Sequence, residues 1–107
     1  MPRYMIQVAY TSGSAKAMVE HPQNREQPVR QAIESVGGKL ESFYFCFGPF
    51  DVVLIVELPD HVSAMAMALA PTSSGGVSRF ETTPLFSAAD AMAAMTKAKS
   101  ATYSPPA

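Results

Sequence analysis

The feature that most constrains the fold of this sequence is a pair of apolar segments, residues 39–47 and 51–58, separated by Gly48-Pro49-Phe50. The first alternates with period two and the second is the most hydrophobic run of the chain, which together predict two strands, and the short linker between them predicts a hairpin. The first segment is expected to place Phe43, Phe45 and Phe47 on one side and Leu40, Tyr44 and Cys46 on the other. Both faces are largely apolar, which is typical of strands in the middle of a sheet.

The segments around this hairpin complete an α+β fold. The expected elements are strands at residues 3–10, 39–47, 51–58 and 77–86, and helical segments at 15–20, 24–36, 61–70 and 88–99. Two right-handed β-α-β units in this order predict a ferredoxin-like βαββαβ fold. Such a fold is a four-stranded antiparallel sheet with helices on one face, here followed by a C-terminal helix.

Local signals mark where the helices begin and end. Asn24, Asp60 and Ser87 are expected to cap helix starts, because their side chains can accept a backbone N–H of the first turn. The Gly37-Gly38 pair is expected to end the first long helix, since glycine takes the left-handed end conformation at little cost. Apolar residues at helical spacing between positions 29 and 36 predict the buried face of that helix.

The composition indicates that water does not reach every side of a single chain. The 107 residues suit one domain at 1–99 with a disordered tail at 100–107, yet only 16% are charged, against about a quarter in ordinary domains. A homodimer packed sheet against sheet, or a higher homo-oligomer, would cover the bare face of the sheet. Met92 and Met95 are expected to fill the core.

Charge and cysteine content exclude some partners and indicate a compartment. The net charge is −1 and the lysines and arginines are scattered, so nucleic acid is not an expected partner. Cys46 is the only cysteine, is expected to pack within a strand, and cannot form an internal disulfide. No stretch is long and apolar enough to span a membrane, and the amino terminus lacks a signal segment. We therefore expect a cytoplasmic protein without membrane contact.

The hairpin and its flanks resemble the GYD domain family, which is named for a Gly-Tyr-Asp motif at this position. The matching residues are Gly38-Lys39-Leu40, the run Phe47-Gly48-Pro49-Phe50-Asp51-Val52-Val53, and Glu57-Leu58-Pro59-Asp60, within a resemblance that covers residues 2–96. Pro49 is inserted and Phe50 replaces the tyrosine, so the phenol hydroxyl of the motif is missing. The resemblance implies a ferredoxin-like, dimeric α/β-barrel type of fold and no established activity.

Asp51 is the candidate site residue that the hairpin itself supplies. One interpretation is structural, in which the carboxylate accepts backbone N–H groups of the hairpin turn and fixes the register of the strands. The other is functional, in which Asp51 lines a cavity between sheet and helices as a general base or ligand anchor, with a pKa raised by burial.

Pro2 and His21 are the other candidate proton carriers. Removal of Met1 would leave Pro2 as a secondary amine at the start of a strand, as in enzymes that resemble the tautomerase superfamily, although the GYD resemblance explains Met1-Pro2 without chemistry. His21, at a helix break, is either a haem or substrate contact, as in some dimeric barrels, or a solvated loop residue.

A set of aromatic and charged residues predicts a ligand-binding pocket between sheet and helices. Its members are Tyr4, Tyr44, Phe50, Asp51 and Arg79, and the further aromatic residues that could line it for an aromatic or flat ligand are Tyr10, Phe43, Phe45 and Phe47. In the alternative interpretation the aromatic residues belong to the core and the dimer interface, and Arg79 forms only a rim ion pair with Glu81.

Three functions remain open at this level. The first is a small homo-oligomeric protein that binds an apolar or aromatic metabolite; the second is a cofactor-independent monooxygenase or isomerase; the third is an assembly or regulatory subunit that docks another protein. We expect no cofactor, because no dinucleotide or phosphate-binding motif is present, and no metal, because His21 and His61 lack further ligands at suitable spacing.

Overall fold

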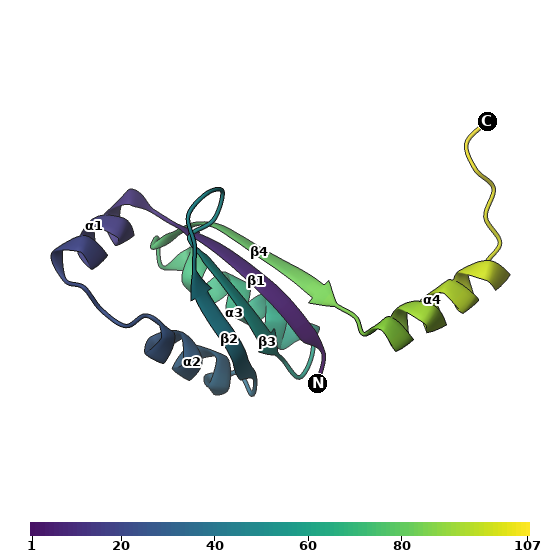
Figure 1. Cartoon of the computed structure of the whole chain (residues 1–107), viewed down its shortest axis with the longest axis horizontal. Coiled ribbons are helices and arrows are strands. Elements are labelled where there is room, and N and C mark those ends of the chain that lie inside the picture. Colours follow the sequence, from purple (N-terminus) through teal and green to yellow (C-terminus); the bar gives the residue numbers. More distant parts are fainter.

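The computed structural model describes all residues, 1–107, as one four-stranded sheet with four helices (Figure 1). The elements are β1 (Arg3–Tyr10), α1 (Ser12–Glu20), α2 (Glu26–Ser35), β2 (Lys39–Phe45), β3 (Val52–Glu57), α3 (His61–Ser73), β4 (Val77–Leu85) and α4 (Ala88–Ser100). Every predicted element is present. The largest differences in bounds are that α1 begins at Ser12 instead of residue 15 and α3 ends at Ser73 instead of residue 70.

The sheet has the strand order β2-β3-β1-β4, and each neighbouring pair is antiparallel. Helix α2 packs beside β2 and α3 beside β4 on the same face of the sheet, which we call the covered face (Figure 1). This arrangement confirms the predicted ferredoxin-like α+β fold.

The core lies between the covered face and these two helices. Its buried residues are Tyr4, Ile6 and Val8 of β1, Leu40 of β2, Val52, Leu54 and Val56 of β3, Leu58, and Ile33, Ala64 and Met67 of the helices. Alternate positions of β1 and β3 contribute, as period two requires. Burying each large side chain of this kind contributes about 1.5–3 kcal/mol, so the covered face holds the monomer together.

Strand β2 departs from simple alternation through a β-bulge. Its pairing with β3 passes from Leu40 to Ser42, which leaves Glu41 as an extra residue. The bulge shifts every later side chain by one position, so Leu40 and Phe43 both contribute to the covered face. The expectation that Leu40 points away from Phe43 is wrong for this reason.

The turn between α2 and β2 requires glycine at both positions. Gly37 has a φ of 84°, in the left-handed region that other residues rarely adopt. A Cβ on Gly38 would lie 2.6 Å from the carbonyl oxygen of Glu57, so the backbone of this turn packs directly against the end of β3. The predicted helix end is confirmed, and the second glycine is explained by close approach.

Helix starts follow the predicted caps with one exception. The side-chain oxygens of Asp60 and Ser87 each accept a backbone N–H three residues further on, at 2.8 and 3.0 Å. Asn24 does not cap a helix; its Oδ1 accepts the N–H of Glu26 at 2.9 Å, which forms a local turn before α2 begins at Glu26.

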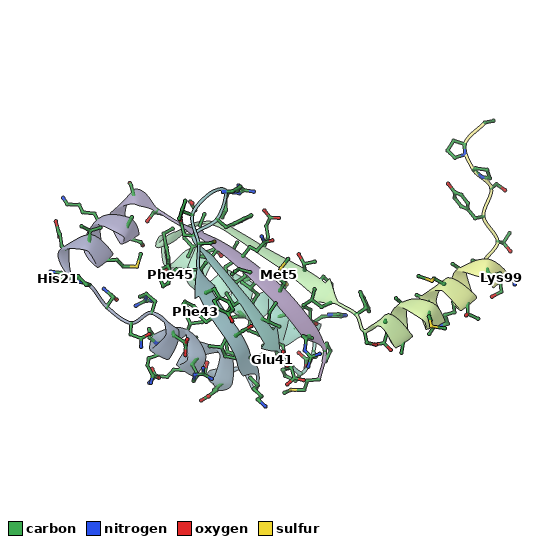
Figure 2. All side chains as sticks on the ribbon, in the orientation of Figure 1. Met5, His21, Glu41, Phe43, Phe45 and Lys99 are labelled. Atoms are coloured by element: carbon green, nitrogen blue, oxygen red, sulfur yellow. The ribbon has the colours of Figure 1, made fainter.

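No helix of the chain packs over the opposite face of the sheet, which we call the open face (Figure 1). Its side chains are those that alternate with the core residues: Met5, Gln7, Tyr44, Val53, Ile55 and Thr83 (Met5 is labelled in Figure 2). Ion pairs lie at its margins, Arg3 with Glu41 and Arg79 with Glu81, both at 2.8 Å. The open face is therefore apolar at the centre and charged at the rim.

Helix α4 extends away from the sheet and the other helices (Figure 1). None of its residues is buried, and Met92 and Met95 are 68% and 67% exposed. The expectation that these methionines fill the core of their own chain is wrong, because α4 has no neighbouring element to pack against. Residues 101–107 follow without regular secondary structure, and the predicted disorder of the tail stays a prediction.

Candidate functional site

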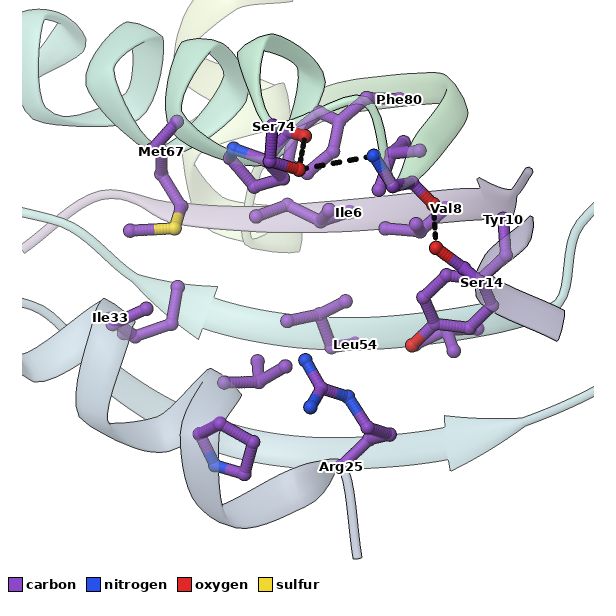
Figure 3. Close-up of a pocket in the computed structure, with 18 of the residues that line it drawn as sticks. Ile6, Val8, Tyr10, Ser14, Arg25, Ile33, Leu54, Met67, Ser74 and Phe80 are labelled. Carbon is purple, nitrogen blue, oxygen red and sulfur yellow. Dashed lines mark hydrogen bonds between the residues drawn. The ribbon is translucent and has the colours of Figure 1, made fainter. Parts of the chain in front are cut away.

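A cavity of about 320 Å³ lies between the covered face and helices α2 and α3 (Figure 3). Thirteen of its nineteen lining residues are hydrophobic. The walls include Ile6, Val8 and Leu54 from the sheet and Val29, Ala32 and Met67 from the helices. Its volume is at the lower end of the range of about 300–1,000 Å³ for small-molecule sites.

Aromatic rings form part of the wall. Tyr10 and Phe43 line the cavity, and Phe45 packs against both, with ring centroids 6.4 Å from Tyr10 and 5.6 Å from Phe43. The Phe43 and Phe45 planes meet at 75°, the edge-to-face arrangement that aromatic pairs favour. These contacts hold the rings at the cavity wall in fixed orientations.

Polar side chains line the cavity where β1 and α3 end and α2 begins. The Ser14 hydroxyl donates to the carbonyl of Gly76 at 2.8 Å, and the Ser74 hydroxyl accepts the Gly76 N–H at 3.1 Å. Arg25 also lines the cavity, immediately before α2, and its guanidinium and the Tyr10 hydroxyl point toward each other (Figure 3).

The Tyr10 hydroxyl is the titratable group of the cavity whose properties are most altered. Burial raises its pKa above the ordinary value for tyrosine, the charge of Asp51 raises it further, and Arg25 opposes the shift. The hydroxyl therefore stays protonated at neutral pH. It can donate a hydrogen bond to an acceptor in the cavity.

Asp51 lies beside this cavity but does not line it. Its Oδ2 accepts the backbone N–H of Tyr10 at 2.9 Å, and its own N–H donates to the carbonyl of Val8 at 2.8 Å. The register of β1 with β4 shifts between Ala9 and Tyr10, so the carboxylate satisfies a backbone group at an irregular point of β1. This is the backbone contact of the structural interpretation, made with β1 instead of with the turn.

Tyr4 is at the wrong end of β1 to reach the cavity. It is 2% exposed, and its hydroxyl is hydrogen-bonded to Nδ1 of His61 at 3.0 Å. Six residues of strand separate it from Tyr10, a distance of roughly 20 Å. Tyr4 is therefore a core residue whose polar tip is satisfied by α3.

Tyr44, Phe50 and Arg79 also lie outside the cavity. Tyr44 is 65% exposed on the open face. The guanidinium carbon of Arg79 lies 4.6 Å from the centre of the Phe50 ring, a cation–π contact next to the Arg79–Glu81 ion pair. The structure brings Phe50 and Arg79 together, but at the rim of the sheet and not in a pocket.

The remaining candidates are exposed. His21 follows α1 at the outer end of that helix (Figure 2). Pro2 precedes β1, and its carbonyl accepts the N–H of Leu58 at 3.0 Å. Cys46 lies in the hairpin loop instead of a strand, exposed, with its thiol donating to the Phe50 carbonyl at 3.2 Å. No group of three or more His, Cys, Asp or Glu residues is placed to hold a metal ion.

Among the polar residues that line the cavity, the sequence indicates only Tyr10, as one of its aromatic candidates, and contains no direct signal for Ser14, Arg25 and Ser74. Tyr10 shares the alternation of the buried β1 residues, which places it on the covered face but does not show that space lies in front of it. Arg25 precedes α2 in an irregular segment, and its position depends on how far α2 stands from the sheet.

None of the helices combines the length and hydrophobicity needed to cross a bilayer.

The antiparallel sheet, the helices on one face and the apolar cavity define a ferredoxin-like α+β protein. A family model for the GYD domain matches residues 4–95, so the chain belongs to the GYD domain family, as its hairpin predicts. No curated protein sequence matches the chain.

Two solved structures are similar to this chain at low sequence identity. MtbAldR has a TM-score of 0.58 and 17% identity, covering 80% of this chain and 53% of that chain. TTHA0845 from Thermus thermophilus has a TM-score of 0.45 and 22% identity, covering 82% of this chain and 96% of that chain. The present chain thus spans about half the length of MtbAldR, and the likeness concerns the fold alone.

Proposed function

We propose that this protein binds a small apolar or aromatic molecule in the cavity of the covered face, and that it works as a homodimer. The cavity carries the proposal, because water inside an apolar space of about 320 Å³ finds few hydrogen-bond partners. A ligand that removes apolar surface from water there gains roughly 25 cal/mol per Å².

An uncharged dye tests the binding site directly. N-phenyl-1-naphthylamine fluoresces strongly in apolar surroundings, and the chain has no tryptophan to interfere. We expect saturable binding to the wild-type protein and weaker binding to Ala32→Met, because Ala32 lines the cavity and the longer side chain takes up part of its volume. Ala66→Met, at an exposed position of α3, is the matched control. Equal dye binding by both variants would contradict the proposal.

The open face supports the homodimer. Its apolar centre, with Met5, Val53 and Ile55, has no helix over it, and the ion pairs at its margins carry both signs of charge. A face that is apolar in the middle and mixed in charge at the rim can meet a copy of itself in a twofold interface.

The sheet alone is too small for a stable interface. Strands of six to nine residues, about 4.8 Å apart and rising about 3.3 Å per residue, give a face on the order of 500 Å². Standard interfaces bury about 800 Å² on each partner. Helix α4 and the segment just before it offer the missing area. Phe86, before the helix, and Met92 and Met95, within it, expose apolar side chains that nothing in their own chain covers. In the proposed dimer, α4 packs on the second copy.

Sedimentation velocity at micromolar concentration tests the dimer. We expect the wild-type protein to sediment as a dimer and Ile55→Lys as a monomer, because the substitution places a charge at the centre of each open face. Gln31→Lys, on the exposed side of α2, should remain a dimer. A wild-type monomer would contradict the proposed interface.

Catalysis is a second candidate function, favoured by the Tyr10 hydroxyl in the cavity. The proton carriers expected from sequence, Asp51, His21 and Pro2, do not line the cavity, so a cofactor-independent monooxygenase or isomerase would rely on Tyr10 as proton donor. Tyr10→Phe separates the candidates: it would abolish turnover of any substrate, whereas a binding protein would retain most of its affinity.

A regulatory or assembly subunit would use the open face for a different protein. Its apolar centre would suit such a partner as well as a second copy. The wild-type sedimentation experiment separates the two, since a chain that pairs with itself leaves no open face for another protein.

A further inference from the structure

Arg25 differs from the other arginines of the chain in having no carboxylate partner. Arg3, Arg30 and Arg79 lie 2.8, 3.1 and 2.8 Å from glutamate oxygens. Arg25 forms no ion pair; its Nη1 donates to Oε1 of Gln23 at 3.0 Å, and its guanidinium also faces the Tyr10 hydroxyl as a hydrogen-bond donor. A guanidinium has five N–H donors, so most of those on Arg25 remain free at the cavity.

Apart from the Tyr10 hydroxyl oxygen, which the Arg25 guanidinium faces, the groups around Arg25 leave the donors at this end of the cavity without an acceptor. Ser14 and Ser74 are already hydrogen-bonded to the backbone of Gly76. The nearby carboxylates are also engaged: Glu26 binds Arg30 at 3.1 Å, and Asp51 accepts the N–H of Tyr10. The Tyr10 hydroxyl, kept protonated by burial, adds one more donor beside the guanidinium.

We infer that Arg25 and Tyr10 bind the carboxylate of an acidic ligand whose apolar body fills the rest of the cavity. The inference rests on the proposed binding function and specifies its ligand as a small aromatic or branched aliphatic carboxylate. The planar fork of arginine matches a carboxylate with two parallel N–H···O bonds, and the tyrosine O–H completes the acceptor shell.

The cavity suits one negative charge and no more. No lysine and no second arginine line it, so the second negative charge of a phosphate would have no cationic partner there. The hydrophobic walls, including Ile6, Leu54 and Phe80, fit a hydrocarbon ring or branched chain (Figure 3). Size and charge together therefore define the ligand class.

A matched pair of compounds tests this inference on the full chain. 2-Naphthoate and 2-naphthamide share the same ring system and differ in charge, and each competes with N-phenyl-1-naphthylamine for the cavity. A charged hydrogen bond contributes about 1.5–3 kcal/mol, so we expect the wild-type protein to prefer the acid by about ten- to a hundredfold. In Arg25→Gln the preference for the acid over the amide should vanish. Arg30→Gln, whose partner is Glu26, should keep the preference.

The outcomes separate this inference from the proposed function. Dye binding with equal affinity for acid and amide, or a preference that survives in Arg25→Gln, would overturn the carboxylate site and leave a neutral-ligand site standing. Absence of dye binding to the wild-type protein would overturn both. Arg25→Lys guards against a folding defect in the glutamine variant, because it keeps the charge and loses the fork; we expect an intermediate preference.

Discussion

The two faces of the sheet carry similar side chains in different surroundings. Along β3, Val52, Leu54 and Val56 are at most 4% exposed beneath the helices, whereas Val53 and Ile55 between them remain partly exposed on the open face. The same apolar alternation therefore serves a core on one side and, in our proposal, an interface on the other. Period two therefore indicates which residues share a face of the sheet, but it does not indicate what covers that face.

Shortening a valine on each face should have the largest effect on this comparison. Val56→Ala, on the covered face, should lower the free energy of unfolding by about 2–3 kcal/mol, since two buried methyl groups are lost and a void remains. Val53→Ala, on the same strand and the open face, should cost less than about 1 kcal/mol in dilute monomer. Urea denaturation measures both; equal losses would show that the faces do not differ.

The next largest effect is expected at Asp51, whose carboxylate accepts the backbone N–H of Tyr10 beside the cavity. Asp51→Ala leaves the N–H of Tyr10 without its acceptor and should destabilise the protein by about 1–3 kcal/mol. Asp51→Asn keeps an acceptor oxygen and should cost less. Both variants should still bind the dye, as measured by fluorescence titration. Loss of binding at unchanged stability would instead place Asp51 in the ligand site.

Neighbouring threonines of β4 sharpen the comparison further. Thr82 pairs with Ile6 on the covered face, and its buried hydroxyl has no hydrogen-bond partner, so Thr82→Val should stabilise the protein by about 1 kcal/mol. Thr83 pairs with Met5 on the open face, and Thr83→Val should change stability by less than about 0.5 kcal/mol. Thermal unfolding separates these outcomes. A Thr82→Val variant less stable than the wild type would contradict the conclusion that the Thr82 hydroxyl lacks a hydrogen-bond partner.

Removal of α4 should have the smallest effect on the monomer. A chain that ends at Phe86 loses no buried residue, so its free energy of unfolding at low protein concentration should change by less than about 0.5 kcal/mol. Its dimer should nevertheless dissociate at least about tenfold more readily, because the proposed interface loses area. Unchanged dimer affinity would remove α4 from the interface.

The sequence was sufficient to predict the fold because its signals are local. Alternation in β1 and β3, the glycine pair at Gly37-Gly38 and the caps at Asp60 and Ser87 each follow from chemistry within a few residues. Family membership followed from the hairpin motif. The bulge at Glu41 escaped prediction because one extra residue in a strand leaves no distinct pattern.

The site was less predictable because it depends on distances between elements. A cavity is present between sheet and helices, where the pocket is expected, and Tyr10 and Phe43 line it, but Tyr4, Tyr44, Phe50, Asp51 and Arg79 do not. An aromatic side chain in a strand predicts a pocket wall only when strand direction and register are also known. Arg25 is recognisable only when the ion pairs of the other arginines are known.

The most direct test is native mass spectrometry of the protein purified from its own host, with a denatured run beside it. It tests both proposals at once: ligand binding at the covered face and dimerisation through the open face. We expect a dimer that carries one small acid per chain, lost on denaturation, and the denatured mass also shows whether Met1 is removed. A monomer without added mass, from a preparation that retains its fold, would contradict both the interface on the open face and the ligand in the covered one.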